Sequence, residues 1–289
     1  MAIILNEHTH ILVQGITGNQ GQFHTAQMLA YGSKITAGVS PGKGGQEVQG
    51  VPVYHSVAEA VTHERIDASV IFIPARFVKD AAYEAMEAGI KTLVIITEHV
   101  PLHDAIDIMA FARKEGVEIV GPNTFGVISP GKSKIGIMPN SIFLPGQVGV
   151  VARSGTLSYE IVSHLSKAGI GQSTVVGLGG DRIVGYSFVD ILKKFEADPE
   201  TQAVVLVGEI GGNAEETAAD YIKGMSKPVV AFLAGKSAPP GKRMGHAGAI
   251  IERGKGTFQS KVEALTDAGA KVAALPWEVS QLLSEIMGS

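Results

Sequence analysis

Short apolar runs alternate with amphipathic segments along the first part of the chain. The runs are rich in β-branched residues and occupy residues 11–14, 34–39, 68–73, 92–96 and 118–120. Alanine-rich segments with apolar residues at helical spacing separate them. Strands that alternate with helices predict a parallel sheet whose connections cross over it.

The alternation pauses between residues 124 and 146, where Gly, Pro, Ser and Lys predominate. This composition predicts a connecting segment. The alternation then resumes, with strands predicted at residues 148–151, 173–177, 203–208, 229–233 and 271–274 and helices such as 157–167 and 214–225. We therefore expect an α/β protein with two doubly wound parallel-sheet domains, residues 1–123 and 147–289, joined by residues 124–146.

Composition narrows the class of protein. The 289 residues are 45% hydrophobic and 18% charged, with a formal net charge of -4, which disfavours a nucleic-acid partner. No apolar run approaches the ~18 residues of a membrane span, and the chain start lacks a basic, signal-like segment. We expect a cytoplasmic protein with no membrane association. The absence of cysteine excludes disulfides, thiolate nucleophiles and sulfur-ligated zinc.

A glycine-rich loop follows the first predicted strand. Its sequence is Gly15-Ile16-Thr17-Gly18-Asn19-Gln20-Gly21, at the start of a predicted helix, where free N–H groups and the helix dipole suit a phosphate. The spacing is not G-x-G-x-x-G, and Gly38-Val39-Ser40-Pro41 carries no acid for a ribose diol, so NAD is disfavoured. The turn Pro41-Gly42-Lys43-Gly44-Gly45 either reaches a phosphate such as that on the ribose of CoA, or is a tight turn with a solvated lysine.

Two motifs in the second predicted domain suggest phosphoryl chemistry. Arg153-Ser154-Gly155-Thr156 joins a strand to a helix, as a phosphate cradle or as an ordinary helix cap. His246 lies among glycines and small residues in Gly241-Lys242-Arg243-Met244-Gly245-His246-Ala247-Gly248-Ala249, on an expected exposed loop. An imidazole is a good nucleophile toward phosphorus at neutral pH. The chain has no G-x-x-x-x-G-K-[ST] loop, so we do not expect it to hydrolyse a nucleoside triphosphate alone.

These motifs resemble the α subunits of the succinyl-CoA synthetase family, from Val13-Gln14-Gly15-Ile16-Thr17-Gly18 to Met244-Gly245-His246-Ala247-Gly248-Ala249. The resemblance implies a Rossmann-like domain that binds CoA and a flavodoxin-like ligase domain that carries a phosphohistidine. The CoA contacts that it implies are Thr17, Gly18, Asn19, Gln20, Lys43, Ile96, Thr97 and Glu98.

The resemblance also assigns catalytic roles. His246 carries the phosphoryl group and Glu209 orients its ring, although on spacing alone Glu209 is equally a surface acid. The implied phosphate and substrate contacts are Ser154, Gly155, Tyr159, Asn123 and Thr124, while spacing alone makes Tyr159 a core residue. No metal ligand is expected in this chain. NTP and Mg²⁺ come with a nucleotide-binding β subunit, in an αβ or α2β2 assembly, and the acid is a small carboxylic acid.

Three departures from the family leave alternatives open. Thr124-Phe125 stands where the family has Cys-Pro, and Arg76 and Arg182 stand where it has proline. These changes are either drift on solvated loops or signs of another acid, such as malate or a sulfonated acid recognised by Arg182. A non-catalytic CoA-binding sensor, an NAD-dependent oxidoreductase and a subunit of a larger fused ligase remain alternatives. The sequence does not distinguish ATP from GTP.

Overall fold

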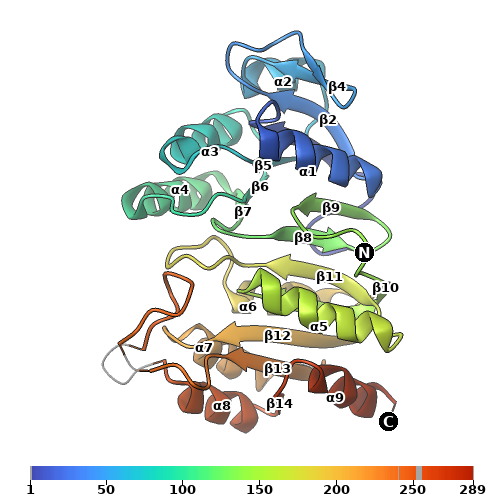
Figure 1. Cartoon of the computed structure of the whole chain (residues 1–289), viewed down its shortest axis with the longest axis vertical. Coiled ribbons are helices and arrows are strands. Elements are labelled where there is room, and N and C mark those ends of the chain that lie inside the picture. Colours follow the sequence, from blue (N-terminus) through green and yellow to red (C-terminus); the bar gives the residue numbers. More distant parts are fainter. Residues whose placement is uncertain (1, 240, 252–255, 289) are drawn as a thin grey trace.

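Two seven-stranded sheets, each flanked by helices, build the computed structural model, which describes residues 2–239, 241–251 and 256–288. The strand order is β3-β4-β2-β1-β5-β6-β7 in the first sheet and β14-β13-β12-β10-β11-β8-β9 in the second. The two sheets follow one another along the long axis of the molecule (Figure 1). The predicted α/β class is confirmed.

The first sheet follows the predicted order of elements. Its strands are β1 (His10–Gln14), β2 (Lys34–Val39), β3 (Glu47–Val48), β4 (Val51–Tyr54), β5 (Ala68–Ile71), β6 (Thr92–Ile95) and β7 (Glu118–Val120). Its helical segments are α1 (Asn19–Ala30), α2 (Val57–His63), η1 (Ala75–Phe77), α3 (Val78–Glu87) and α4 (Leu102–Glu115). All five predicted strands are present, and β3 and β4 are additional because strands this short leave little periodic signal. The pair β3–β4 is antiparallel, so the sheet is parallel except at that edge.

The second sheet is also parallel at its centre. Its strands are β8 (Gly126–Ser129), β9 (Ser133–Gly136), β10 (Pro145–Ala152), β11 (Gln172–Gly177), β12 (Ala203–Glu209), β13 (Val229–Ala234) and β14 (Lys271–Ala273). Helices α5 (Gly155–Lys167) and α9 (Glu278–Met287) contact each other, whereas α7 (Ala214–Ile222) lies between α6 (Phe188–Ala197) and α8 (Phe258–Asp267). Helix α5 lies in front of the sheet and α6 behind it (Figure 1).

The predicted connecting segment is more ordered than its composition suggests. Strands β8 and β9 form an antiparallel hairpin within residues 124–146, and β8 pairs antiparallel with β11. The apolar residues Val127, Ile128 and Ile135 are fully buried, but strands of only four residues among Gly, Ser and Lys did not stand out in the sequence. This segment therefore extends the second sheet, which makes that sheet mixed rather than wholly parallel. The exact domain boundaries stay a prediction.

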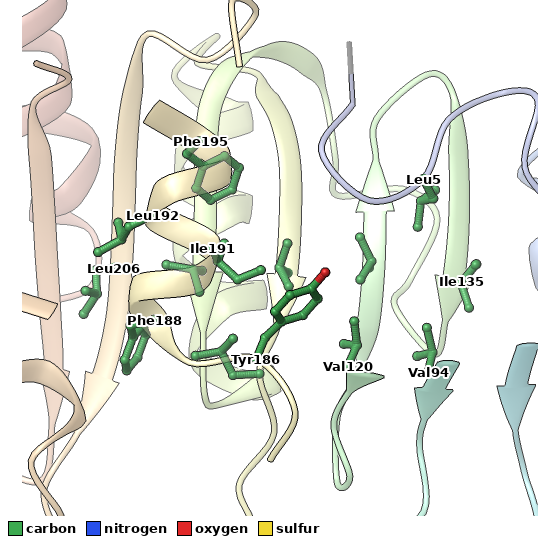
Figure 2. Close-up of a cluster of buried hydrophobic side chains, with 14 of the residues drawn as sticks. Leu5, Val94, Val120, Ile135, Tyr186, Phe188, Ile191, Leu192, Phe195 and Leu206 are labelled. Atoms are coloured by element: carbon green, nitrogen blue, oxygen red, sulfur yellow. The ribbon is translucent and has the colours of Figure 1, made fainter. Parts of the chain in front are cut away.

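A continuous apolar cluster joins the two sheets. Val120 of the first sheet and Ile135 of the hairpin belong to the same buried cluster as Tyr186 and Phe195 (Figure 2). Hydrogen bonds reinforce the joint, because Ser33 Oγ donates to the carbonyl of Lys134 at 2.7 Å and accepts from its amide at 2.9 Å. The packing fixes one sheet relative to the other. Within the described ranges, no helix combines the length and apolar character needed to cross a membrane.

Candidate active site

His246 and Glu209 meet at the end of a central strand of the second sheet. Glu209 is the last residue of β12 and is 6% exposed, and its Oε2 lies 2.7 Å from Nδ1 of His246. His246 lies on the loop after β13, with a side chain 27% exposed, so it is more enclosed than the expected exposed loop residue. Within this loop the amide of Met244 donates to Ala249 O at 2.9 Å. The geometry leaves Nε2 as the ring nitrogen that Glu209 does not engage.

The imidazole of His246 packs against the backbone of Gly180. A Cβ built on Gly180 would lie 2.5 Å from Cδ2 and 2.6 Å from Cγ of His246, closer than any side chain tolerates. The ring therefore rests directly on the backbone that follows β11. The amide of Gly248, in the histidine loop, donates to Gly180 O at 3.4 Å, which ties the two segments together.

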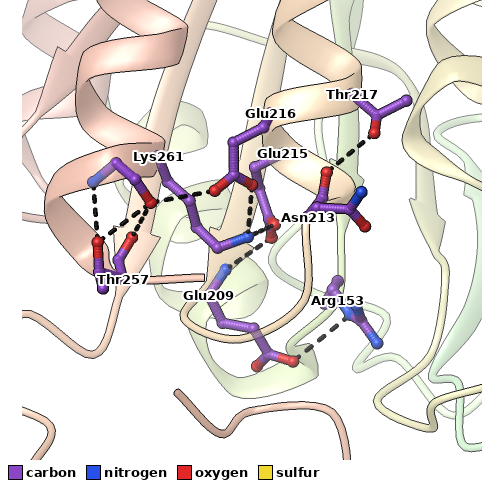
Figure 3. Close-up of polar contacts among 9 residues, drawn as sticks. Arg153, Glu209, Asn213, Glu215, Glu216, Thr217, Thr257 and Lys261 are labelled. Carbon is purple, nitrogen blue, oxygen red and sulfur yellow. Dashed lines mark hydrogen bonds and ion pairs between the residues drawn. The ribbon is translucent and has the colours of Figure 1, made fainter. Parts of the chain in front are cut away.

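Arg153 holds the second oxygen of the carboxylate. Its Nε lies 3.4 Å from Glu209 Oε1, an ion pair without hydrogen-bond geometry (Figure 3). Its Nη2 donates to Asp181 O at 2.9 Å. Both side chains are largely buried, at 12% and 8% exposure. Arg153 therefore holds one oxygen of the carboxylate while the other contacts Nδ1 of the imidazole.

Opposing influences act on the pKa of His246. The hydrogen bond to Glu209 raises the pKa of the ring above its ordinary value, while burial and Arg153 oppose this rise. Glu98, from the loop after β6, adds a smaller upward effect. Glu98 also contributes to a raised pKa of Asp181, whose main cause is burial. The end of β6 in the first sheet is thus electrostatically close to the histidine loop of the second.

The start of helix α5 carries the predicted phosphate cradle. Ser154 is its N-cap, and its Oγ accepts from the amide of Leu157 at 3.5 Å, so the capping role is present. Gly155 begins the helix against the ring of Phe125, to which a Cβ would come within 3.3 Å. Tyr159 packs edge-on to Phe125 with ring centroids 5.6 Å apart, and burial raises the pKa of its hydroxyl. Contact of Ser154, Gly155 or Tyr159 with phosphate or substrate stays a prediction.

The loop at residues 122–126 uses its polar groups internally. Thr124 is 4% exposed, and its hydroxyl donates to Gly177 O at 2.6 Å and accepts from the amide of Gly126 at 2.9 Å. Those two bonds disfavour its predicted contact with substrate. Asn123 donates from Nδ2 to Asp181 Oδ1 at 3.0 Å. Phe125 is 5% exposed, so this aromatic substitution belongs to the core rather than to a ligand surface.

The two arginines that depart from the family pattern lie on the surface. Arg182 is exposed, and its Nε donates to Ala247 O at 3.2 Å, beside the histidine. Arg76 is exposed in η1, which follows β5, and its guanidinium lies 4.7 Å from the ring centroid of Phe77. Arg182 is therefore the substitution that adjoins the histidine loop.

The predicted CoA residues gather at the carboxyl ends of strands in the first sheet. Gly18 is the N-cap of α1 and provides no side-chain cap, so the exposed first turn keeps N–H groups available for an anion. Lys43 is exposed on the turn after β2. The remaining predicted residues lie just before α1, in its first turn or after β6: Thr17, Asn19, Gln20, Ile96, Thr97 and Glu98. This donor set suits a phosphate-bearing substrate such as CoA.

The two threonines among the predicted CoA residues use their hydroxyls in hydrogen bonds within the protein. Thr17 Oγ1 donates to Ser40 Oγ at 2.9 Å, and Thr97 Oγ1 donates to Ile73 O at 2.7 Å. Their place at the strand ends is thereby fixed. Any contact of Thr17 or Thr97 with CoA remains a prediction.

Sequence reasoning gave no role to Arg153, Gly180 or Asp181. Arg153 is part of the predicted cradle motif, where a basic residue beside Ser154 was a usable signal. Gly180 and Asp181 lie in a Gly-Gly-Asp turn, but nothing in the sequence places this turn against the histidine. The described residues bring together no group of three or more His, Asp or Glu side chains that could hold a metal ion.

Two family models match the chain. The CoA binding domain matches residues 6–99, in the first sheet, and the CoA-ligase family matches residues 151–271, in the second. The subunit alpha 2 of ADP-forming succinate–CoA ligase from Archaeoglobus fulgidus is 60% identical over 287 residues, which cover 99% of this chain and 100% of that protein. The corresponding subunit alpha from Methanothermobacter thermautotrophicus is 58% identical and covers 98% of this chain and 96% of its own length.

A solved structure extends the comparison to a larger enzyme. ATP citrate lyase from Methanothrix soehngenii, in complex with citrate and coenzyme A, is 27% identical with a TM-score of 0.87. The match covers 99% of this chain and 52% of the lyase chain, so this chain spans about half the length of that enzyme. Identity and coverage along nearly the whole chain show that the protein belongs to the family of α subunits of ADP-forming succinate–CoA ligase.

Proposed function

We propose that this chain is the α subunit of an ADP-forming succinate–CoA ligase, that its first domain binds CoA and that His246 carries the phosphoryl group. The observation that carries the proposal is the 2.7 Å contact between His246 Nδ1 and Glu209 Oε2. A carboxylate on one ring nitrogen fixes the tautomer and orients the other nitrogen for attack. The names of the relatives support succinate as the acid and ATP as the nucleotide.

The geometry of the site supports the following phosphoryl transfer. Nε2 of the neutral ring attacks the terminal phosphorus of ATP, the bond from that phosphorus to the bridging oxygen breaks, and ADP leaves. Meanwhile Nδ1–H donates to Glu209, which stabilises the positive charge that develops on the ring. Arg153, whose Nε lies 3.4 Å from Glu209 Oε1, holds the carboxylate in place during this step. The first-turn N–H groups of α5, beginning at Gly155, are suited to stabilise the phosphoryl oxygens. Splitting the transfer into two steps lowers each barrier.

The second half of the reaction consumes the phosphohistidine. The phosphoryl group passes to a carboxylate of succinate, and the thiol of CoA then displaces phosphate from the acyl phosphate. Glu98, a predicted CoA contact in the first domain, acts electrostatically on His246, which supports CoA in the first domain reaching the acyl phosphate formed near His246 in the second. The proposal includes a nucleotide-binding β subunit, in an αβ or α2β2 assembly, and Mg²⁺ there would neutralise charge on the nucleotide phosphates.

The comparisons favour this function over the other candidates. Relatives of full length are named as ligase subunits, which argues against a non-catalytic CoA sensor and against an NAD-dependent oxidoreductase. The uncapped glycine loop at Gly18 fits a phosphate of CoA without needing a ribose-binding acid.

Radiolabelling tests the phosphoryl relay directly. The chain, co-purified with its nucleotide-binding subunit, is incubated with γ-labelled ATP and Mg²⁺, alongside a His246→Asn variant and a His164→Asn control that alters a histidine on α5. We expect an acid-labile, base-stable label that persists in the control, disappears in His246→Asn and is discharged by succinate with CoA. A complex that binds ATP yet acquires no label would overturn the proposed relay.

A panel of acids tests the substrate. Succinate, malate and a sulfonated analogue are compared by kcat/KM in the wild type and in Arg182→Pro, which restores the family residue. We expect both proteins to prefer succinate. The relatives are named as succinate–CoA ligases, and Arg182 already donates a hydrogen bond to Ala247 O. A wild-type preference for malate or the sulfonate that reverts in Arg182→Pro would assign the acid specificity to Arg182 instead.

A further inference from the structure

A buried ion pair lies directly behind Glu209. Glu215, in the first turn of α7, and Lys261, on α8, are both 0% exposed, and the Lys261 ammonium is paired with Oε2 of Glu215 (Figure 3). The same Nζ lies 3.0 Å from Glu216 Oε2, and Glu216 Oε1 accepts from Ser260 Oγ at 3.1 Å. The ammonium therefore bridges two acids of α7 from the neighbouring helix.

The other oxygen of Glu215 holds the backbone of Glu209. Glu215 Oε1 accepts from the amide of Glu209 at 3.0 Å, at the point where β12 ends. The approach requires a glycine at the preceding position, because a Cβ on Gly208 would lie 2.7 Å from Glu215 Cγ. The carboxylate thus fixes the peptide from which the side chain of Glu209 projects.

A contribution to the stability of the fold is a weak explanation for why a buried ion pair is present here. Two charges lose their hydration when they are buried, and apolar residues of similar volume often stabilise a fold as well or better. The pair does, however, fix an orientation, because a charged acceptor held by a cation makes a strong and directional bond to an amide. The contacts run from Lys261 through Glu215 to the amide of Glu209, and from its carboxylate to His246.

We propose that Glu215, held in place by Lys261, is a positioning residue that aims the Glu209 carboxylate at Nδ1 of His246. This inference rests on the proposed phosphoryl transfer for its consequence, but its geometry is independent of it. Glu215 touches neither the imidazole nor any reacting atom. Its effect passes through the backbone of Glu209.

Two double variants isolate the acceptor. Glu215→Gln with Lys261→Met removes both charges but keeps an amide oxygen for the Glu209 N–H, whereas Glu215→Leu with Lys261→Met removes the acceptor as well. Neither variant leaves an unpaired lysine in the core. The matched control is Lys134→Met, since Lys134 is also 0% exposed but lies on β9 and donates to Met138 O and Asn140, which follow that strand. Glu209→Gln serves as the positive control.

The readouts separate positioning from structure. The pKa of the His246 ring is measured by NMR on the full chain, with the signal assigned from the His246→Asn spectrum, and the rate of phosphoryl labelling is measured in the complex. In the Leu/Met variant we expect the ring pKa to fall toward its ordinary value of about 6.5, as in Glu209→Gln, and labelling to slow on the order of tenfold or more. The Gln/Met variant keeps an acceptor but loses the cation that holds it, so we expect a smaller fall in its ring pKa, whereas Lys134→Met should keep the wild-type ring pKa.

The outcomes discriminate between the possible failures. A Leu/Met variant that loses stability but keeps the wild-type ring pKa and labelling rate would overturn the positioning role. Should that variant not fold, Gly208→Ala displaces Glu215 by contact with its Cγ, and the same fall in ring pKa is expected. An unchanged ring pKa in a folded Gly208→Ala protein counts against the role equally. If no protein in the series acquires label while the ring pKa responds as expected, the proposed relay fails and the positioning role stands.

Discussion

Gly180→Ala is the substitution that most directly tests whether Gly180 sets the position of the His246 ring. The new Cβ would lie 2.5 Å from Cδ2 and 3.0 Å from Nδ1 of the imidazole, whereas carbon atoms in contact lie at about 3.5–4.0 Å. The ring must therefore move by about 1 Å. A comparable movement away from Glu209 would lengthen their 2.7 Å bond beyond the range of a hydrogen bond.

The expected loss is kinetic rather than structural. A misplacement of about 1 Å at a reacting group costs on the order of 100-fold in rate, so we expect phosphoryl labelling to slow by about that factor. The ring is the movable partner, so the free energy of unfolding should change by less than about 1 kcal/mol. Gly224→Ala is the matched control, because a Cβ there meets only Tyr221 O at an ordinary 3.8 Å.

The assay combines three measurements on both alanine variants. Single-turnover labelling in the complex gives the rate, NMR of the full chain gives the pKa of His246, and urea unfolding gives the stability. A wild-type rate of labelling together with an unchanged pKa of His246 in Gly180→Ala would show that Gly180 does not set the position of the ring. Equal losses in both variants would show a general effect of the added methyl group.

Three further predictions follow from individual contacts. Glu209→Gln should lower the pKa of His246. Because the folded-state pKa of His246 is raised, protonation of the ring stabilises the fold below the unfolded pKa of about 6.5, and this stability is lost as pH rises through the folded pKa. The free energy of unfolding in urea should therefore fall over that pH range in the wild type and not in Glu209→Gln. Lys43→Ala should weaken CoA binding by at most about fivefold in calorimetry, the range of an exposed ion pair, and no change would remove Lys43 from the site. Phe195→Ala should cost about 3–5 kcal/mol in urea unfolding because Phe195 is fully buried, and a smaller loss would mean that the core collapses around it.

The order of the main elements was predictable because their signal is local. The last five residues of β10 and all of β12 are buried on both faces of the sheet and therefore appear in the sequence as continuous apolar runs between helices. Short edge strands gave no such signal. The hairpin β8–β9 lies in a segment whose glycines and prolines indicate turns, and only its pairing with β11 makes strands of it.

The candidate site was predictable in part for the same reason. The surroundings of His246 and the glycine loop at Gly18 stand out by composition and by resemblance to a known family. The role of Thr124 was not settled by its sequence position, because a hydroxyl on a loop can face either a substrate or the backbone. In the structure it is bonded to Gly177 and Gly126, which disfavours the substrate contact.

The sequence by itself determined the α/β class, the two-sheet architecture, the family and the histidine loop, since each of these depends on periodicity or on contiguous residues. Tertiary structure decided which distant residues touch. Glu209 and His246 are 37 positions apart, and Glu215 and Lys261 are 46 apart. Such contacts depend on strand order and on the packing of α7 against α8, which no local pattern encodes. The glycine beneath the imidazole and the ion pair behind Glu209 become visible only when the chain is folded.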